Sequence, residues 1–235
     1  MSLNKPANWR KTAFTYSRLI TSPHYEQIEC PDGNIKHMFK GREIINRNTR
    51  INGNICVGTS PREAIVVDDQ KDQILARAYS VLFARQKAKA AINGDDWKET
   101  ILNEAFDLAR ELLPYDLSGV ERVNKENGVE DDGKIQLGAY IVKKCGVCRH
   151  QALLVAYLLE KFIDDGYLQG TVSFNRNAVD KKGGHGFVRY TNSRGKVIII
   201  DPAKGRGGLI EEMPNNKWDY RQPGELGLPD YEIAV

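Results

Sequence analysis

The chain has 235 residues, of which 41% are hydrophobic and 28% charged, a composition typical of a globular domain rather than of a disordered or fibrous one. Its 34 basic and 31 acidic residues are too evenly balanced to indicate binding to nucleic acid or to an anionic membrane. It contains no apolar run near the roughly 20 residues that span a bilayer, and its start, MSLNKPANWRKTAF, lacks the apolar core of a secretory signal. We therefore expect a cytoplasmic protein, or one delivered by a signal not recognisable in this sequence, with reduced cysteines.

The first part of the chain, residues 1–68, predicts an irregular and partly β extension. It is rich in Asn, Gly, Arg and Thr. Short β-prone pieces occur at 51–57 and 64–67, where β-branched residues gather. We expect this extension to precede the catalytic part of the protein.

Two helices are predicted next. Apolar residues at helical spacing indicate a helix over 69–91, with Asp68 or Asp69 available as its N-cap. A second helix is predicted over 97–113 and would end at Pro114. Both carry an apolar stripe that needs a partner.

The middle of the chain contains a polar stretch and then the most apolar one. Residues 115–134 are polar, with Gly and Asp, and predict a surface loop. A short apolar stretch at 136–142 follows. Residues 151–162 are then almost wholly apolar, which predicts a central helix buried on most of its surface.

Three β-like runs follow the central helix, at 171–174, 186–191 and 196–200. Asn192-Ser193-Arg194-Gly195 is a turn sequence, so the last two runs predict a hairpin. Helices, a central helix and an antiparallel meander make an α+β pattern. We place the core at 69–203 and expect the tail, 204–235, to wrap over the surface or to be mobile.

Cys148 is the first candidate functional residue. It stands at the start of the central helix, where unpaired backbone N–H groups and the helix dipole favour a thiolate. Thiolate is the reactive form of cysteine. Gly146 would let the chain turn sharply and leave room for a substrate. The same position also suits a buried structural cysteine.

His185 is the second candidate. It lies in Gly183-Gly184-His185-Gly186 at the head of a predicted strand. The glycines would leave its imidazole accessible, and histidine titrates near neutral pH. With a cysteine at a helix start, it has the layout of a Cys–His pair.

Asp201 completes the set. It ends the apolar strand that precedes Pro202, and an acid at the end of a buried strand needs a partner. The turn centred near residue 193 would return Asp201 towards His185. There it would hold the imidazole tautomer and stabilise the imidazolium.

Several blocks around these residues resemble the core of the transglutaminase-like superfamily, which has a G-x-C block opening a helix, a G-H-x-aromatic block opening a strand, and a D-P pair ending the next strand. The matching blocks are Gly146-Val147-Cys148-Arg149, Gly184-His185-Gly186-Phe187-Val188 and Ile200-Asp201-Pro202-Ala203. The Cys-Arg-His stretch is also similar to a block in a group of plant N-terminal domains. The resemblance covers about residues 136–203.

The resemblance implies a papain-like fold, in which a central helix packs on an antiparallel sheet, and thiol acyl chemistry. Cys148 would be the nucleophile, His185 the general base and then acid, and Asp201 the residue that orients it. The oxyanion would meet the Cys148 backbone N–H and an upstream donor, for which Gln136 and Tyr140 are candidates. The implied function is protease, deamidase or transglutaminase activity on a protein or peptide substrate, with no cofactor and no metal.

Two alternatives remain open at this point. Cys145 and Cys148 form a C-x-x-C pair that, with His150 and His185, offers metal ligands or a redox couple. Only one such pair exists, and no thioredoxin-like context surrounds it. The other alternative is a non-catalytic interaction module on the same fold.

Overall fold

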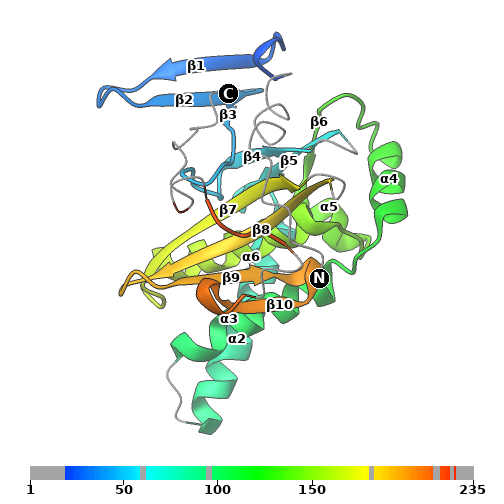
Figure 1. Cartoon of the computed structure of the whole chain (residues 1–235). Helices are drawn as coiled ribbons and strands as arrows, with labels where there is room; N and C mark the ends of the chain where they lie inside the picture. Colours follow the sequence, from blue (N-terminus) through cyan, green and yellow to red (C-terminus); the bar gives the residue numbers. More distant parts are fainter. Residues whose placement is uncertain are drawn as a thin grey trace, which may run out of the picture.

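A computed structural model describes residues 19–58, 62–93, 97–179, 183–213, 218–222 and 225. It shows an α+β protein with three sheets and a central helix, α6 (Cys148–Asp164), which packs on the largest of the sheets, while the sheet of β1, β2 and β3 lies at the far end of the molecule (Figure 1). The predicted fold class is therefore correct at this level. None of the helices within the described ranges combines the length and apolarity needed to cross a membrane.

The largest sheet has four antiparallel strands in the order β10-β9-β8-β7. Their bounds are β7 Gly170–Val179, β8 Gly183–Asn192, β9 Val197–Asp201 and β10 Arg206–Leu209. The predicted hairpin is present: β8 and β9 pair with Val188 opposite Ile200. Gly195 closes the turn with a φ of 76°, a conformation that glycine adopts without strain.

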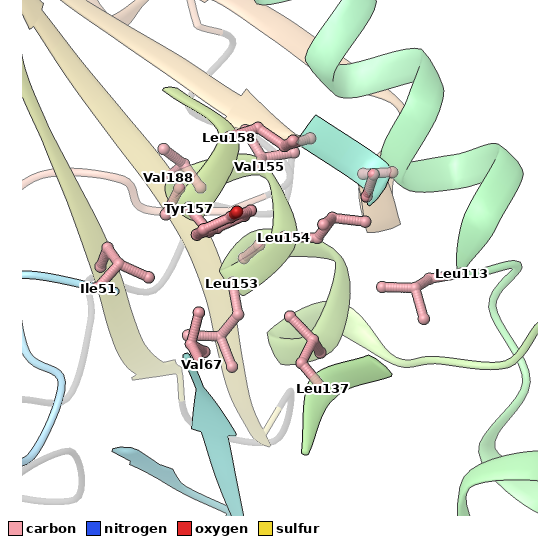
Figure 2. Close-up of a cluster of buried hydrophobic side chains, with 14 of the residues drawn as sticks. Ile51, Val67, Leu113, Leu137, Leu153, Leu154, Val155, Tyr157, Leu158 and Val188 are labelled. Carbon is pink, nitrogen blue, oxygen red and sulfur yellow. The ribbon is translucent and has the colours of Figure 1, made fainter. Parts of the chain in front are cut away.

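Helix α6 is buried on every side (Figure 2). Every residue from Ala152 to Leu159 is fully buried. One face packs on β7 and β8 and others meet α3 and α2, so every side must be apolar. Figure 2 shows Leu153 and Leu154 beside side chains contributed by distant parts of the chain, including Val67 and Leu137.

The two predicted helices are α2 (Gln73–Asn93) and α3 (Trp97–Leu112). Helix α2 begins later than expected because Asp72, and not Asp68 or Asp69, is its cap. The Asp72 Oδ1 atom accepts hydrogen bonds from the N–H groups of Ile74 (3.1 Å) and Leu75 (3.3 Å). Capping of this kind places the first turn.

The prediction of a surface loop over 115–134 is wrong. Residues Leu117–Glu126 form helix α4, capped by Asp116, whose Oδ1 accepts from the Gly119 N–H at 2.9 Å. Val120 and Val123 lie three residues apart on its buried face. Two buried valines and one N-cap are thus enough for this largely polar helix to pack against the hydrophobic core.

The next elements are β6 (Gly133–Gln136) and helix α5 (Leu137–Val142), which corresponds to the short apolar stretch predicted before α6. The Gly138 N–H donates to Asp72 Oδ2 at 2.7 Å. This bond joins α5 to the cap of α2.

The N-terminal part is partly β, as predicted, but it is also part of the core. Its strands are β1 (Tyr25–Glu29), β2 (Ile35–Phe39), β3 (Arg42–Glu43), β4 (Asn54–Val57) and β5 (Glu63–Val67). Strand β5 pairs antiparallel with β4 and parallel with β6. Ile51, Ile65 and Val67 belong to the same hydrophobic cluster as α6.

The predicted tail begins with β10, the edge strand of the main sheet, and its residues Trp218 and Tyr220 lie on the face of that sheet opposite α6. Side chains alternate along a strand, so Val188 faces α6 while Phe187 and Ile199 face away and cluster with Trp218 and Tyr220. Two short 3-10 turns, η1 (Pro202–Lys204) and η2 (Ile210–Glu212), flank β10. The last residues of the predicted tail lie outside the described residues.

Candidate active site

Cys148 is the first residue of α6 and is half-buried. The residue before it, Val147, has an extended backbone and donates its N–H to the Nδ1 of His150 at 3.2 Å. The N–H groups of a first helical turn have no carbonyl partner within the helix. The thiol therefore stands beside the positive end of a 17-residue helix.

Gly146 fixes how the chain enters this helix. Its N–H donates to the Pro114 carbonyl at 3.0 Å, and its own carbonyl accepts from the Asp116 N–H at 2.8 Å. A side chain at this position would stand 3.1 Å from Leu113 and 3.2 Å from His150, which is tighter than normal packing. The glycine here allows close packing against Leu113 and His150, while its φ is not in the left-handed region, so the chain turn does not itself require a glycine.

His185 and Asp201 are brought together by the β8–β9 hairpin. Val188 pairs with Ile200, so the next position in the same register puts Asp201 opposite Phe187. His185 is two residues from Phe187 on the same face of the sheet, which makes it a diagonal neighbour of Asp201. The His185 Nε2 atom lies 2.7 Å from Asp201 Oδ2. The register argument from sequence therefore placed the two side chains correctly.

His185 also contacts Cys148, since its side chain is hydrogen-bonded to the thiol. The Gly186 N–H donates a further hydrogen bond to the sulfur. A side chain on Gly186 would stand 3.3 Å from the Cα of Arg149, so the glycine lets β8 approach the first turn of α6. The structure thus joins all three predicted residues in a chain from thiol to imidazole to carboxylate.

The electrostatics of this chain favour a charged pair. Burial alone would raise the pKa of the Cys148 thiol, but the hydrogen bond and charge of His185, the Gly186 N–H and the Arg149 charge lower it to about 7. Burial would likewise lower the pKa of His185, but Asp201 and Cys148 raise it to about 9. Between these values the site holds a thiolate beside an imidazolium.

Asp201 is fully buried and has three hydrogen-bond donors around it. Besides His185, the Tyr220 hydroxyl donates to Oδ2 at 2.7 Å and the Lys204 N–H donates to Oδ1 at 3.1 Å. A buried carboxylate needs such partners to stay charged. Tyr220 was not predicted, because it comes from the tail.

Trp218 covers the other side of the histidine. Its ring lies edge-on to the His185 ring, with centroids 5.0 Å apart, and its indole N–H donates to Asn177 Oδ1. Asn177 is the partner of His185 across the β7–β8 pair. Trp218 is 4% exposed, so it shields the His185–Asp201 pair from water.

A buried ion pair lies beneath the thiol. Arg149, directly after Cys148, pairs with Glu63 at the start of β5. Glu63 is fully buried. The pair fastens the first turn of α6 to β5 and keeps a positive charge near the sulfur. Glu63 gave no signal in the sequence, because nothing there predicts its contact with α6.

An open groove of about 490 Å³ lies beside the start of α6. The C-terminal end of α3, the exposed Tyr115, Gln151 of α6 and Pro202 of η1 line it. Burial and the nearby charge of Cys148 raise the pKa of Tyr115, which places this side chain close to the thiol. Cys148 and His185 are not among the residues that line this groove.

The structure does not support Tyr140 as an oxyanion donor. Tyr140 is fully buried, and its hydroxyl donates to Asn124 Oδ1 at 2.5 Å. The prediction failed because the ring of Tyr140 packs against His150 in the core instead of facing the thiol.

Gln136 lies at the N-cap of α5, and its backbone pairs with Val66 of β5. Glu63 is the residue of β5 that reaches the start of α6, and three residues of a strand span about 10 Å. Gln136 therefore lies three strand positions beyond the level of Glu63. As an oxyanion donor it stays a prediction without a described contact to the thiol.

The structure does not support the alternative in which Cys145 and Cys148 form a metal or redox site together with His150 and His185. Cys145 is buried, and its Cβ lies 2.7 Å from where a side chain on Gly119 would begin. Burial raises the pKa of Cys145 and lowers that of His150, which caps α6 as a neutral imidazole. Across the described ranges, no three His, Cys, Asp or Glu side chains gather as a metal site.

No family model, curated protein or solved structure matches the chain.

Proposed function

We propose that the protein catalyses thiol-dependent acyl transfer or hydrolysis on a peptide or glutamine-type amide, with a transglutaminase-like, papain-type core. The chain of contacts from Cys148 to His185 to Asp201 is the observation that carries this proposal. It combines a nucleophile at a helix start, a base in contact with it, and a carboxylate that orients the base.

The first half of the reaction forms a thioester. The Cys148 thiolate attacks the carbonyl carbon of the amide, and the negative charge passes to the carbonyl oxygen. The Cys148 N–H, at the start of α6, would stabilise this oxyanion. The His185 imidazolium then gives its proton to the amide nitrogen, the C–N bond breaks, and ammonia or an amine leaves.

The second half releases the acyl group. Water or an amine attacks the thioester carbonyl, and neutral His185 takes the proton of the attacking group. The C–S bond breaks, and the released thiolate again pairs with the imidazolium. Water yields an acid, as in a protease or deamidase, while an amine yields a new amide, as in a transglutaminase.

Selective alkylation tests the activated thiol directly. Limited iodoacetamide near pH 6, followed by peptide mass spectrometry, should label Cys148 before the other three cysteines. Burial raises the pKa of Cys145, and that of Cys56 to about 12. Cys30, which is partly exposed in the β1–β2 turn, is the internal control for simple accessibility.

A second arm of this experiment uses the variant His185→Gln. It should remove the preference for Cys148 while leaving labelling of Cys30 unchanged. Equal, slow labelling of Cys148 and Cys30 in the unmodified protein would refute an activated thiolate.

The reaction itself is tested with glutamine-containing peptides. Ammonia release, peptide cleavage and incorporation of a labelled primary amine would be followed side by side. We expect one of them to depend on Cys148 and to vanish in Cys148→Ala. If all three were unaffected by Cys148→Ala, the proposed reaction would be wrong.

A further inference from the structure

We propose that Tyr220 is a positioning residue of the catalytic pair, acting as a second hydrogen-bond donor to the same Asp201 oxygen that holds His185. This inference rests on the proposed function. It extends the site beyond the predicted three residues to a segment, 218–222, that follows them in the chain and closes over the main sheet.

The geometry at Asp201 is specific. The Tyr220 hydroxyl and the His185 Nε2 atom each lie 2.7 Å from Oδ2, while the Lys204 N–H occupies Oδ1. Burial and the charge of Asp201 raise the pKa of Tyr220, so its hydroxyl keeps its proton and donates. The carboxylate therefore divides its charge between the imidazole and the phenol.

Tyr220 is held in place from several sides. Its ring lies edge-on to Phe187 with centroids 4.9 Å apart, and it is 2% exposed. Its carbonyl accepts from Arg189 of β8 at 2.8 Å, and Arg189 also binds Glu225 through both guanidinium nitrogens. A phenol fixed in this way limits rotation of the Asp201 carboxylate.

The charged groups around this carboxylate come from several elements. His185 of β8 binds the carboxylate, and Cys148 of α6, with Arg149 beside it, lies on the other side of His185. Lys204 of η1, whose ammonium lies over the Trp218 ring, and Arg206 of β10, whose side chain is hydrogen-bonded to the Tyr220 hydroxyl, complete the set. The change Tyr220→Phe keeps all of these charged side chains, although Arg206 loses the hydroxyl as a hydrogen-bond partner. It removes only the hydroxyl, so any change in the titration of His185 reports on that hydroxyl.

Loss of this donor has a predictable sign. Without the phenol, Asp201 concentrates its negative charge on His185, so the imidazolium becomes harder to deprotonate. A hydrogen bond to a charged group is strong enough to shift that titration by roughly half to one pH unit. The phenol thus keeps His185 from holding its proton too tightly to act as a base in the second half-reaction.

The test is the rate of Cys148 alkylation as a function of pH, read residue by residue by mass spectrometry. The unmodified protein should show two transitions, for Cys148 near pH 7 and for His185 near pH 9. In Tyr220→Phe the upper transition should move upward by roughly half to one unit. This readout needs no known substrate.

Tyr190→Phe is the matched control. Tyr190 is also a buried tyrosine of the main sheet, but its hydroxyl donates to the Gln169 carbonyl, away from Asp201. It should leave the upper transition unchanged. The proposal would be overturned if the upper transition of Tyr220→Phe had its midpoint at the same pH as that of Tyr190→Phe, or at a lower pH.

A second substitution tests the hydrogen bond from Tyr220 to Asp201 by strengthening it, so the expected shift of the upper transition has the opposite sign. 3-Fluorotyrosine at position 220 keeps the ring and the hydroxyl but makes the phenol a stronger donor, so the upper transition should move downward. No downward movement would also count against the proposal. If Cys148 is not preferentially alkylated in the unmodified protein, the proposed function fails, and the role of Tyr220, which rests on it, fails with it. Preferential alkylation of Cys148 with an unmoved upper transition in Tyr220→Phe refutes the role of Tyr220 alone.

Discussion

The two faces of the main sheet are built differently. The face on α6 is sealed by aliphatic and aromatic side chains such as Phe174, Val188 and Ile200. The opposite face carries His185 and Asp201, and Trp218 and Tyr220 cover it with hydrogen bonds as well as ring contacts. We infer that the first face supplies stability and that, under the proposed function, the second orients the reacting groups.

This difference separates the expected effects of mutations. Changes on the α6 face should lower the free energy of unfolding and affect activity only through folding. Conservative changes of the polar groups on the opposite face, such as Tyr220→Phe, should act mainly on ionisation and turnover, although truncation of its buried side chains, such as Phe187, would also lower stability. The predictions below run from the largest effect to the smallest.

Cys148→Ala should reduce amide turnover by at least about 10³-fold, because it removes the group that forms the thioester. Its melting temperature should stay near that of the unmodified protein, since Cys148 is only half-buried. Turnover and thermal melting would be measured on the same sample. Retained turnover would show that the reaction occurs elsewhere.

Asp201→Asn should reduce turnover by roughly 10²- to 10⁴-fold, since an amide can favour the wrong imidazole tautomer and does not stabilise an imidazolium. It should also shift the His185 transition of the alkylation profile downward, because the carboxylate that raises the pKa of His185 is lost. An unshifted transition would mean that Asp201 does not control this histidine.

Leu154→Ala tests the α6 face. Leu154 is fully buried in the central helix (Figure 2), so its truncation should cost about 2–5 kcal/mol in the free energy of unfolding. Denaturant titration measures this cost. At a temperature where the variant is still folded, its alkylation profile should match that of the unmodified protein. A displaced profile would show that the two faces are coupled.

Sequence reasoning predicted much of this arrangement but missed its outer layer. The two β-prone runs, counted outward from the turn at Asn192–Gly195, were enough to predict that His185 and Asp201 come together, because hairpin register is set locally. The apolar run of α6 likewise identified the central helix. Helix α4 was missed because its sequence is largely polar, and only the Asp116 cap and two buried valines distinguish it from a surface loop.

The remaining errors concern contacts between distant parts of the chain. Tyr220 reaches Asp201 and Glu63 reaches Arg149 through packing that no local pattern encodes. Tyr140 was misassigned for the same reason, since its ring faces His150. The aromatic residues Trp218 and Tyr220, alternating in an otherwise polar tail, are the signal that could have indicated a docked segment.

The pKa of the Cys148 thiol tests the central claim most directly. Its alkylation rate should rise with a midpoint near pH 7, below the ordinary 9.0, because His185, with its pKa raised to about 9, stays protonated beside it. In His185→Gln the midpoint should move up towards that ordinary value. A midpoint at or above pH 9 in the unmodified protein, unmoved by His185→Gln, would contradict a thiolate–imidazolium site.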